Sequence, residues 1–226
     1  MTHYDYPGVY ISFEGGEGAG KTTQIFSARD YFQLFNIETL LTKEPGNAGD
    51  YKGKIRALLL DPDHEKVSPY AELFLYAADR NNHVNNVVMP ALQKGNVVIS
   101  DRGYDSTTAY QGYGRGLDLE TVTYINSIAR EGLSTNLTFF LDLDPKIGLA
   151  RSIREEFGET QDRLESEAIE FHEKVRHGFY EISRQEPERL KIIDASNSKE
   201  DTFEQIKYHL DQVIEEKFSY SRNSLP

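Results

Sequence analysis

Residues 15–22 combine glycines with a lysine and a threonine in the order Gly15-x-x-x-x-Gly20-Lys21-Thr22. Glycines let backbone N–H groups turn inward around phosphate oxygens, and a helix that starts after the loop adds positive potential. The lysine of such a loop contacts the outer phosphates, and the next hydroxyl can bind magnesium. The spacing predicts a phosphate-binding loop for ATP, with a glycine turn and an exposed lysine as the alternative. The residues expected to contact ATP here are Gly15, Gly16, Glu17, Gly18, Ala19, Gly20, Lys21, Thr22 and Thr23.

Asp101 and Arg102 directly follow residues 96–100, which have the apolar composition of a buried strand. Ligands of open α/β sheets bind at the carboxyl ends of the strands, which is where this pair would lie. Asp101 could help to hold a metal ion, and Arg102 could bridge the phosphates of a donor and an acceptor. A structural ion pair is the alternative explanation for Asp101.

Tyr76 and Arg80 are four residues apart in a strongly helical stretch, so both lie on one helix face. The tyrosine ring could stack on a nucleobase while the guanidinium donates a hydrogen bond to a base acceptor. A packed tyrosine beside a surface arginine has the same spacing, so both interpretations stay open at this point.

Three arginines, Arg151, Arg154 and Arg163, flank a charged segment over residues 154–162 that has no apolar period. Arginines on a loop that closes over substrate can stabilise the charge of a phosphoryl group in transfer. Acidic residues are interleaved with these arginines, so a solvated surface held by salt bridges fits the spacing equally well. Residues 45–54, with three glycines, are a second candidate for a mobile loop.

Short β-rich runs alternate with helical patterns and provide the elements that must position these side chains. The runs that indicate strands cover residues 9–13, 38–42, 96–100, 137–143 and 191–193. Helical periodicity covers residues 21–35, 69–94, 119–130, 163–184 and 199–217. Buried strands that alternate with helices predict an α/β fold with a parallel, helix-covered sheet. Residues 219–226 have the composition of a frayed tail.

The chain has 226 residues, a formal net charge of −12 and no cysteine. This length suits one domain over residues 1–226. The acidic charge argues against a nucleic-acid polymer as partner, but a small phosphorylated ligand remains compatible with it. Without a long apolar stretch or a basic start, we expect no membrane span and no secretory signal, and therefore a cytoplasmic protein. The histidines lack metal-ligand spacing, so no zinc site is expected.

Taken together, these segments resemble the thymidylate kinase family, which phosphorylates thymidine monophosphate (dTMP) to the diphosphate. The similarity follows the family order through residues 9–23, 42–46, 55–60, 71–80, 100–118 and 140–151, and it resumes at residues 162–180. Its most specific part is Asp101-Arg102-Gly103-Tyr104-Asp105-Ser106-Thr107-Thr108-Ala109-Tyr110-Gln111-Gly112, because a generic phosphate-loop protein does not need it.

The resemblance implies a three-layer P-loop nucleoside monophosphate kinase fold with a five-stranded parallel sheet in the order 2-3-1-4-5. It implies in-line transfer from ATP to dTMP, in the synthesis of dTTP, by a homodimer. Mg²⁺ would be the metal, and Thr22 and Asp101 would hold it.

Position by position, the resemblance places Tyr76 where an aromatic ring stacks on thymine and Arg80 where a base carbonyl is bound. Arg56 and Arg102 match residues that hold the monophosphate, and Glu17 matches the loop carboxylate near the acceptor sugar and the metal. The residues implied to bind dTMP are Glu44, Arg56, Tyr76, Arg80, Arg102, Ser106, Thr107, Tyr110 and Gln111.

The loop segment Glu17-Gly18-Ala19 has no basic side chain, so the sequence is similar to the subgroup whose lid provides the arginine that assists transfer. The lid would cover about residues 151–163, with Arg154 acting in transfer and Arg151 and Arg163 on ATP. The residues implied to be catalytic are therefore Lys21, Arg102, Arg154 and Glu17. Two alternatives remain: a kinase for another pyrimidine nucleotide or a deoxynucleoside, and a nucleotide-gated binding protein that transfers nothing.

Overall fold

The structure is a computed structural model that describes residues 6–46, 53–60, 67–155, 164 and 167–218, with residues 153–155 described by their backbone alone. Five parallel strands form one sheet in the order β2-β3-β1-β4-β5, which confirms the predicted order. The strands are β1 (Val9–Glu14), β2 (Thr39–Lys43), β3 (Val97–Asp101), β4 (Leu137–Asp142) and β5 (Leu190–Asp194).

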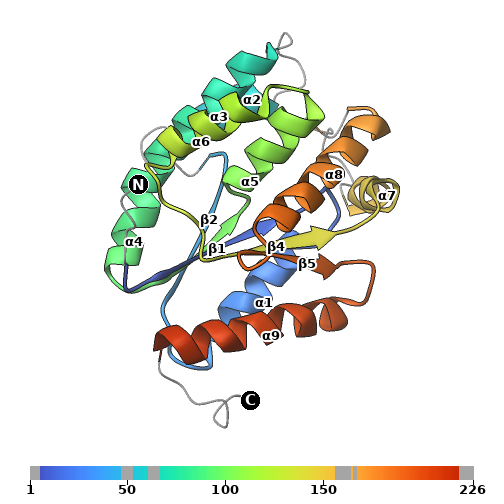
Figure 1. The fold of residues 1–226 in the computed structure, drawn as a ribbon. Helices are drawn as coiled ribbons and strands as arrows, with labels where there is room; N and C mark the ends of the chain where they lie inside the picture. Colours follow the sequence, from blue (N-terminus) through green and yellow to red (C-terminus); the bar gives the residue numbers. More distant parts are fainter. Residues whose placement is uncertain (1–5, 47–52, 61–66, 156–163, 165–166, 219–226) are drawn as a thin grey trace.

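Two helices, α1 (Lys21–Gln33) and α9 (Lys199–Phe218), cover one face of the sheet (Figure 1). Successive side chains of a strand point to opposite faces. Val9, Ile11 and Phe13 of β1 are fully buried and belong to the same apolar cluster as the inner faces of α1 and α9. This largest cluster fixes the start of α1 beside the end of β1, where the phosphate loop must form.

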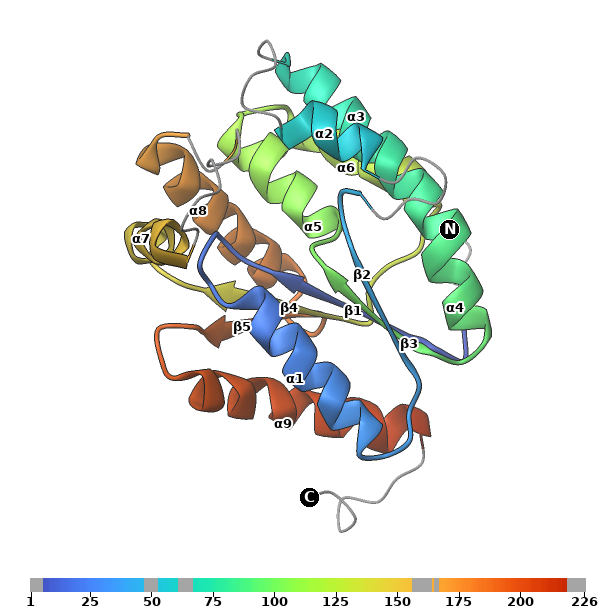
Figure 2. The same ribbon diagram turned by 180° about the vertical axis from the view of Figure 1, so that it is seen from behind.

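The other face carries the remaining helices, as the view from behind shows (Figure 2). Tyr10 of β1 packs there with apolar residues of the continuous helical segment from α3 to α4, while Phe140 of β4 packs with Phe179 of α8. The elements outside the α1 and α9 layer are α2 (Lys54–Leu60), α3 (Pro69–His83), η2 (Val84–Val88), α4 (Met89–Gln93), α5 (Tyr104–Thr107), η3 (Thr108–Gly114), α6 (Leu119–Ala129), α7 (Pro145–Glu155) and α8 (Ile169–Gln185). The sheet therefore lies between two helical layers.

The same face carries a row of fully buried polar side chains across the sheet. Ser12 of β1 lies level with Ser100 of β3 and with Thr138 near the start of β4, and Glu14 follows at the carboxyl end of β1. The hydroxyl groups of Ser12 and Thr138 lie 2.8 Å apart, so hydrogen bonding compensates part of the cost of burial. A buried polar strip is thus placed beneath the edge where the candidate site forms.

The predicted helix over residues 69–94 is confirmed as one continuous helical segment, which consists of α3, a π-helical turn and α4 and ends at Gln93. Two predicted loop boundaries were wrong. The predicted loop 45–54 ends in helix α2, which begins at Lys54. The predicted loop 154–162 begins inside α7, which ends at Glu155, and its remaining residues lie outside the described part of the chain.

Within the ranges that the structure describes, no helix has both the length and the apolar character required to cross a bilayer.

Candidate active site

The phosphate loop connects β1 to α1, as the motif predicted. Gly15 has φ +147°, and a Cβ atom there would lie 2.8 Å from the carbonyl oxygen of Leu141. Gly18 has φ +64°, and a Cβ atom there would lie 2.2 Å from the carbonyl oxygen of Gly148. Any other residue at either position would be strained in φ and would clash with backbone. The glycines are therefore required by the close packing of the loop against β4 and α7.

Lys21 is the first residue of α1, and its side chain is buried at the mouth of the loop. Its Nζ donates hydrogen bonds to the carbonyl oxygens of Gly15 at 3.2 Å and Gly16 at 2.9 Å. Burial, and next the positive charge of Arg102, lowers the pKa of Lys21. The positive charge of a buried ammonium group is less well solvated than that of an exposed one. A bound phosphate therefore stabilises the charged form of Lys21 more strongly.

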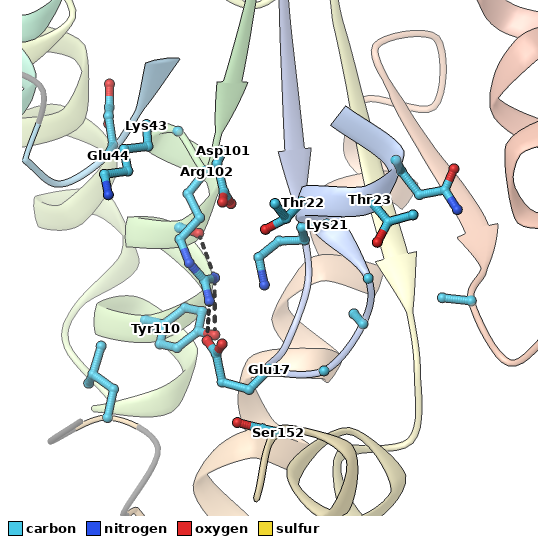
Figure 3. Close-up of a pocket in the computed structure, with 18 of the residues that line it drawn as sticks. Glu17, Lys21, Thr22, Thr23, Lys43, Glu44, Asp101, Arg102, Tyr110 and Ser152 are labelled. Carbon is cyan, nitrogen blue, oxygen red and sulfur yellow. Dashed lines mark hydrogen bonds and ion pairs between the residues drawn. The ribbon is translucent and has the colours of Figure 1, made fainter. Parts of the chain in front are cut away.

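Arg102 crosses the mouth of the loop and forms an ion pair with Glu17 (Figure 3). Its Nη1 also donates to the carbonyl of Gly15 at 3.0 Å and lies 3.2 Å from the hydroxyl of Tyr110. Burial alone would raise the pKa of Glu17, but the charges of Lys21 and Arg102 outweigh it and lower the pKa to about 2. Glu17 is therefore ionised at neutral pH and holds the guanidinium beside the loop.

The backbone of Arg102 is itself strained, because its φ of +68° is in the left-handed region that non-glycine residues avoid. Its N–H donates to the carbonyl of Phe13 at 2.9 Å, and its own carbonyl accepts from the Ser100 hydroxyl at 2.7 Å. Such strain costs about 1–3 kcal/mol and persists where the surroundings over-determine it, typically at functional sites.

Arg80 of α3 is buried, so the alternative of a surface arginine beside a packed tyrosine is wrong. Its Nε donates to Glu44 at 2.8 Å and its Nη2 donates to the carbonyl of Gly103 at 3.1 Å. Its Nη1 donates to the hydroxyl of Thr107 and to Oδ1 of Asn126. A guanidinium has five N–H groups, so one Nη2 proton has no partner among the described residues.

Both carboxylate oxygens of Glu44 hold neighbouring side chains in the cavity wall that contains Arg80. Oε2 accepts from Arg80, and Oε1 lies 2.9 Å from Nδ1 of His83, whose Nε2 lies 2.6 Å from the hydroxyl of Thr42. All four side chains are buried. Glu44 therefore serves here to position Arg80, while it still reaches the cavity edge.

Arg56, from helix α2, also lines the cavity. Its Nη1 donates to the carbonyl of Pro45 at 3.1 Å, and a Cβ atom at Gly46 would lie 2.9 Å from the Arg56 side chain. The N–H of Gly46 donates to Asp79 at 3.0 Å. The segment after β2 and helix α2 are thereby held together at the cavity rim.

One cavity of about 810 Å³ connects these groups. Most of the predicted site residues line it, namely Glu17, Gly18, Ala19, Gly20, Lys21, Thr22, Thr23, Glu44, Arg56, Tyr76, Arg80, Asp101, Arg102, Ser106, Thr107, Tyr110, Gln111 and Arg151. Gly15 and Gly16 do not line it, although the carbonyls of both accept from Lys21. The side chains of Arg154 and Arg163 lie outside the described part of the structure.

Sequence reasoning missed two parts of this site. The segment after β5 lines the cavity with Asn197, Ser198 and Lys199, and its only sequence signal was its position after a strand. Asn126 is buried against Arg80. The sequence feature that could have revealed it is a polar residue on the same helix face as the apolar Val122 and Ala129. Arg151 donates to the carbonyl of Ala195 at 3.4 Å, which places it at the segment after β5.

The donors available for a metal ion are oxygen atoms. Oδ1 of Asp101 is buried without a hydrogen-bond partner among the described residues, and both Asp101 and Thr22 line the cavity. The part of the chain that the structure describes holds no group of three or more His, Cys, Asp or Glu side chains suited to a metal. A site with so few protein oxygens is compatible with Mg²⁺, because this ion is usually bound by one or two side chains together with phosphates and water.

A glycine loop at the start of a helix, a buried lysine and an arginine-rich acceptor wall on a parallel sheet define the class of P-loop nucleoside monophosphate kinases. The profile of the family described as Thymidylate kinase matches residues 13–206. The chain belongs to the thymidylate kinase family.

Individual relatives agree with this assignment. The thymidylate kinase of Gloeobacter violaceus is 46% identical over 93% of this chain and 98% of its own length. That of Synechococcus sp. (strain JA-2-3B'a(2-13)) is 48% identical over 84% of this chain and 88% of its own length. The solved thymidylate kinase from Ehrlichia chaffeensis has a TM-score of 0.71 and 29% identity, and the match covers 90% of this chain and 98% of that one. The resemblance seen in the sequence is confirmed.

Proposed function

We propose that this chain transfers the γ-phosphoryl group of ATP to dTMP, giving ADP and thymidine diphosphate for the synthesis of dTTP. The observation that carries the proposal is the single cavity that joins the phosphate loop to a wall containing Tyr76, Arg80 and Gln111. Two nucleotides that enter from opposite ends would meet between Lys21 and Arg102. Proximity and orientation of this kind supply much of the acceleration in phosphoryl transfer.

The donor end of the cavity lies between the phosphate loop and the segment after β5. Backbone N–H groups of the loop and the start of α1 would hold the phosphates of ATP, with Lys21 on the outer ones. Asn197, Ser198 and Lys199 line the same end and would face the nucleoside part of ATP. This gives the donor a fixed direction along the cavity.

At the acceptor end, Arg56 and Arg102 would hold the monophosphate, and Tyr76 would stack on thymine. The remaining Nη2 proton of Arg80 would donate to O4 of the base. Cytosine presents an amine at that position, and a donor facing a donor leaves both unpaired. Tyr110, next to Arg102, would crowd the 2′ position of the sugar and so disfavour ribose.

In the transfer step, an oxygen of the acceptor phosphate forms a bond to the γ-phosphorus while the bond to the β–γ bridging oxygen breaks, and ADP leaves with that electron pair. The acceptor oxygen is already anionic near neutral pH, so no general base is required. Lys21 and Arg102 would neutralise the charge that spreads over the transferring group. Mg²⁺, held with Thr22 and Asp101, would supply further neutralisation of the donor phosphates when bound.

The arginine that assists transfer is assigned to the lid at about residues 151–163, because the phosphate loop has no basic side chain before Lys21. Arg154 is the proposed transfer residue. Arg151, which contacts the segment after β5, and Arg163 would bind ATP.

The proposed enzyme is a cytoplasmic homodimer of one domain per chain. Its interface would use α3 and α6, which pack against each other and expose large apolar side chains. Phe74 of α3 is 56% exposed, and Tyr124 and Ile128 of α6 are 67% and 57% exposed. Exposed apolar area on neighbouring helices favours burial against a second copy. Analytical ultracentrifugation of the purified chain tests this assembly, because a homodimer has twice the mass of one chain.

The decisive experiment is a coupled assay of ADP release with dTMP, dUMP, UMP, CMP and thymidine as acceptors. We expect dTMP to have the highest kcat/KM. A better rate with another pyrimidine nucleotide or with thymidine would favour the rival kinase, and ATP hydrolysis without transfer to any acceptor would favour a nucleotide-gated binding protein.

A further inference from the structure

Glu72, in the first turn of α3, lies directly behind the acceptor wall and does not line the cavity. Its side chain is 1% exposed. Oε1 accepts a hydrogen bond from Nε2 of Gln111 at 2.7 Å. Gln111 does line the cavity, so Glu72 can influence a ligand through Gln111.

Arg115, at the end of η3, lies against the same carboxylate. Its Nε is 3.3 Å from Oε1 and its Nη2 is 3.4 Å from Oε2, while its Nη1 donates to Glu167 at 2.5 Å. A guanidinium at this distance favours the ionised carboxylate, and an ionised carboxylate can only accept hydrogen bonds.

An acceptor-only partner decides which way the amide of Gln111 faces. The NH₂ group must turn to Glu72, because the alternative would bring two oxygens together in a buried place. Oε1 of Gln111 is then directed elsewhere, and it accepts no hydrogen bond from any residue that the structure describes. Residue 111 therefore offers an acceptor on the same cavity that Arg80 lines.

We propose that Glu72 is a positioning residue for acceptor selectivity, which fixes the Gln111 amide with its oxygen toward the base. The proposal deepens the function proposed above. Thymine and uracil carry a proton on N3 and can donate to this oxygen. Cytosine has a lone pair on N3, so two acceptors would face each other and both would stay unpaired. Glu72 thus makes the wall reject cytosine at N3, in addition to ring position 4, where cytosine carries an amine.

The test compares kcat/KM for dTMP and dCMP in the wild type and in Glu72→Gln. A glutamine at position 72 can donate or accept, so the amide of Gln111 is free to turn over. We expect the dTMP to dCMP ratio to fall about tenfold, mainly through KM for the nucleotides, while KM for ATP stays within about twofold. An unchanged ratio overturns the proposal.

Two controls separate positioning from a loss of packing. In a Gln111→Ala background, Glu72→Gln should leave the ratio unchanged, because the group that it orients is gone. Asp142→Asn removes another partly buried acid, which pairs with Arg176 at 2.6 Å, and should lower stability without changing the ratio. An equal fall of the ratio in Asp142→Asn, or a persistent effect in the Gln111→Ala background, overturns the proposal.

A measurement on the wild type covers the case in which Glu72→Gln does not fold. Hydrogen exchange of the Gln111 side-chain amide, followed by NMR, should be slow in the free protein and should not slow further when dTMP binds. Stronger protection on binding would place the NH₂ group on the base and overturn the proposal. Wild-type turnover of dTMP tests the proposed function separately, so the two failures are distinguishable.

Discussion

Arg80 and Glu44 form an ion pair at 2.8 Å with both side chains almost fully buried, at 3% and 4% exposure. Burying two charges is costly, and a pair of this kind is retained only with good geometry and further hydrogen bonds. Here Glu44 also contacts His83, while Arg80 contacts Thr107 and Asn126. Contacts within the protein thus hold Arg80 in its place on the cavity wall.

The first prediction concerns this pair. Glu44→Gln should lower the free energy of unfolding by about 3 kcal/mol, because Arg80 keeps a buried charge without its partner. It should also raise KM for dTMP more than KM for ATP. Urea unfolding and steady-state kinetics measure both effects. The control is Glu186→Gln, at a half-exposed carboxylate that pairs with Arg189, which should cost less than about 1 kcal/mol. Equal losses in the two variants would contradict the prediction.

The second prediction concerns Lys21. Lys21→Ala should reduce kcat by about 10²–10³, the usual loss for one group that stabilises transition-state charge. The free energy of unfolding should change by less than about 1 kcal/mol, because the ammonium is partly desolvated and its burial lowers its pKa. Lys43→Ala is the matched control, since Lys43 is an exposed lysine on the same cavity. Unchanged turnover in Lys21→Ala would exclude the proposed mechanism.

The third prediction concerns the lid. Arg154→Ala should lower kcat by about tenfold or more and leave KM for both substrates nearly unchanged, as expected for a contact that is strongest in the transition state. Arg184→Ala, at a 73% exposed arginine on α8, should have no effect. Full turnover of Arg154→Ala would move the role to Arg151 or Arg163.

The fourth prediction is a pH dependence of stability. Burial, reinforced by the charge of Asp105, raises the pKa of Glu14 from 4.5 to about 8. Between these two values the folded chain holds one more proton than the unfolded chain. Stability from this group is therefore complete below pH 4.5 and is lost as the pH rises toward 8, by about 1.4 kcal/mol per pH unit.

Glu14→Gln tests this directly, because an amide keeps the shape of the protonated acid and can still accept from the Ser106 hydroxyl, which lies 2.5 Å from Glu14. Urea unfolding at several pH values between 5 and 9 should show a flatter profile for the variant than for the wild type. The same decline in both proteins would mean that a different group titrates.

Much of the fold and of the site could be predicted from the sequence. The phosphate loop and most of the cavity-lining residues were found because a loop motif and a helix face depend on neighbours in the chain. The strand order was implied by the family resemblance. Helices α2 and α7 were missed, and the segment after β5 was not recognised as part of the site. Helix α2 is short and the segment after β5 is a loop, so neither has a clear period, whereas α7 is amphipathic and its pattern was overlooked.

By itself the sequence determined that a phosphate loop precedes a helix, that Tyr76 and Arg80 share a helix face, and that the chain resembles one kinase family. Only the tertiary structure decided that Arg80 is buried and that Glu72 meets Gln111, which is 39 residues away. Spacing along the chain sets which side chains share a face, but burial and the choice of hydrogen-bond partner depend on which elements pack together.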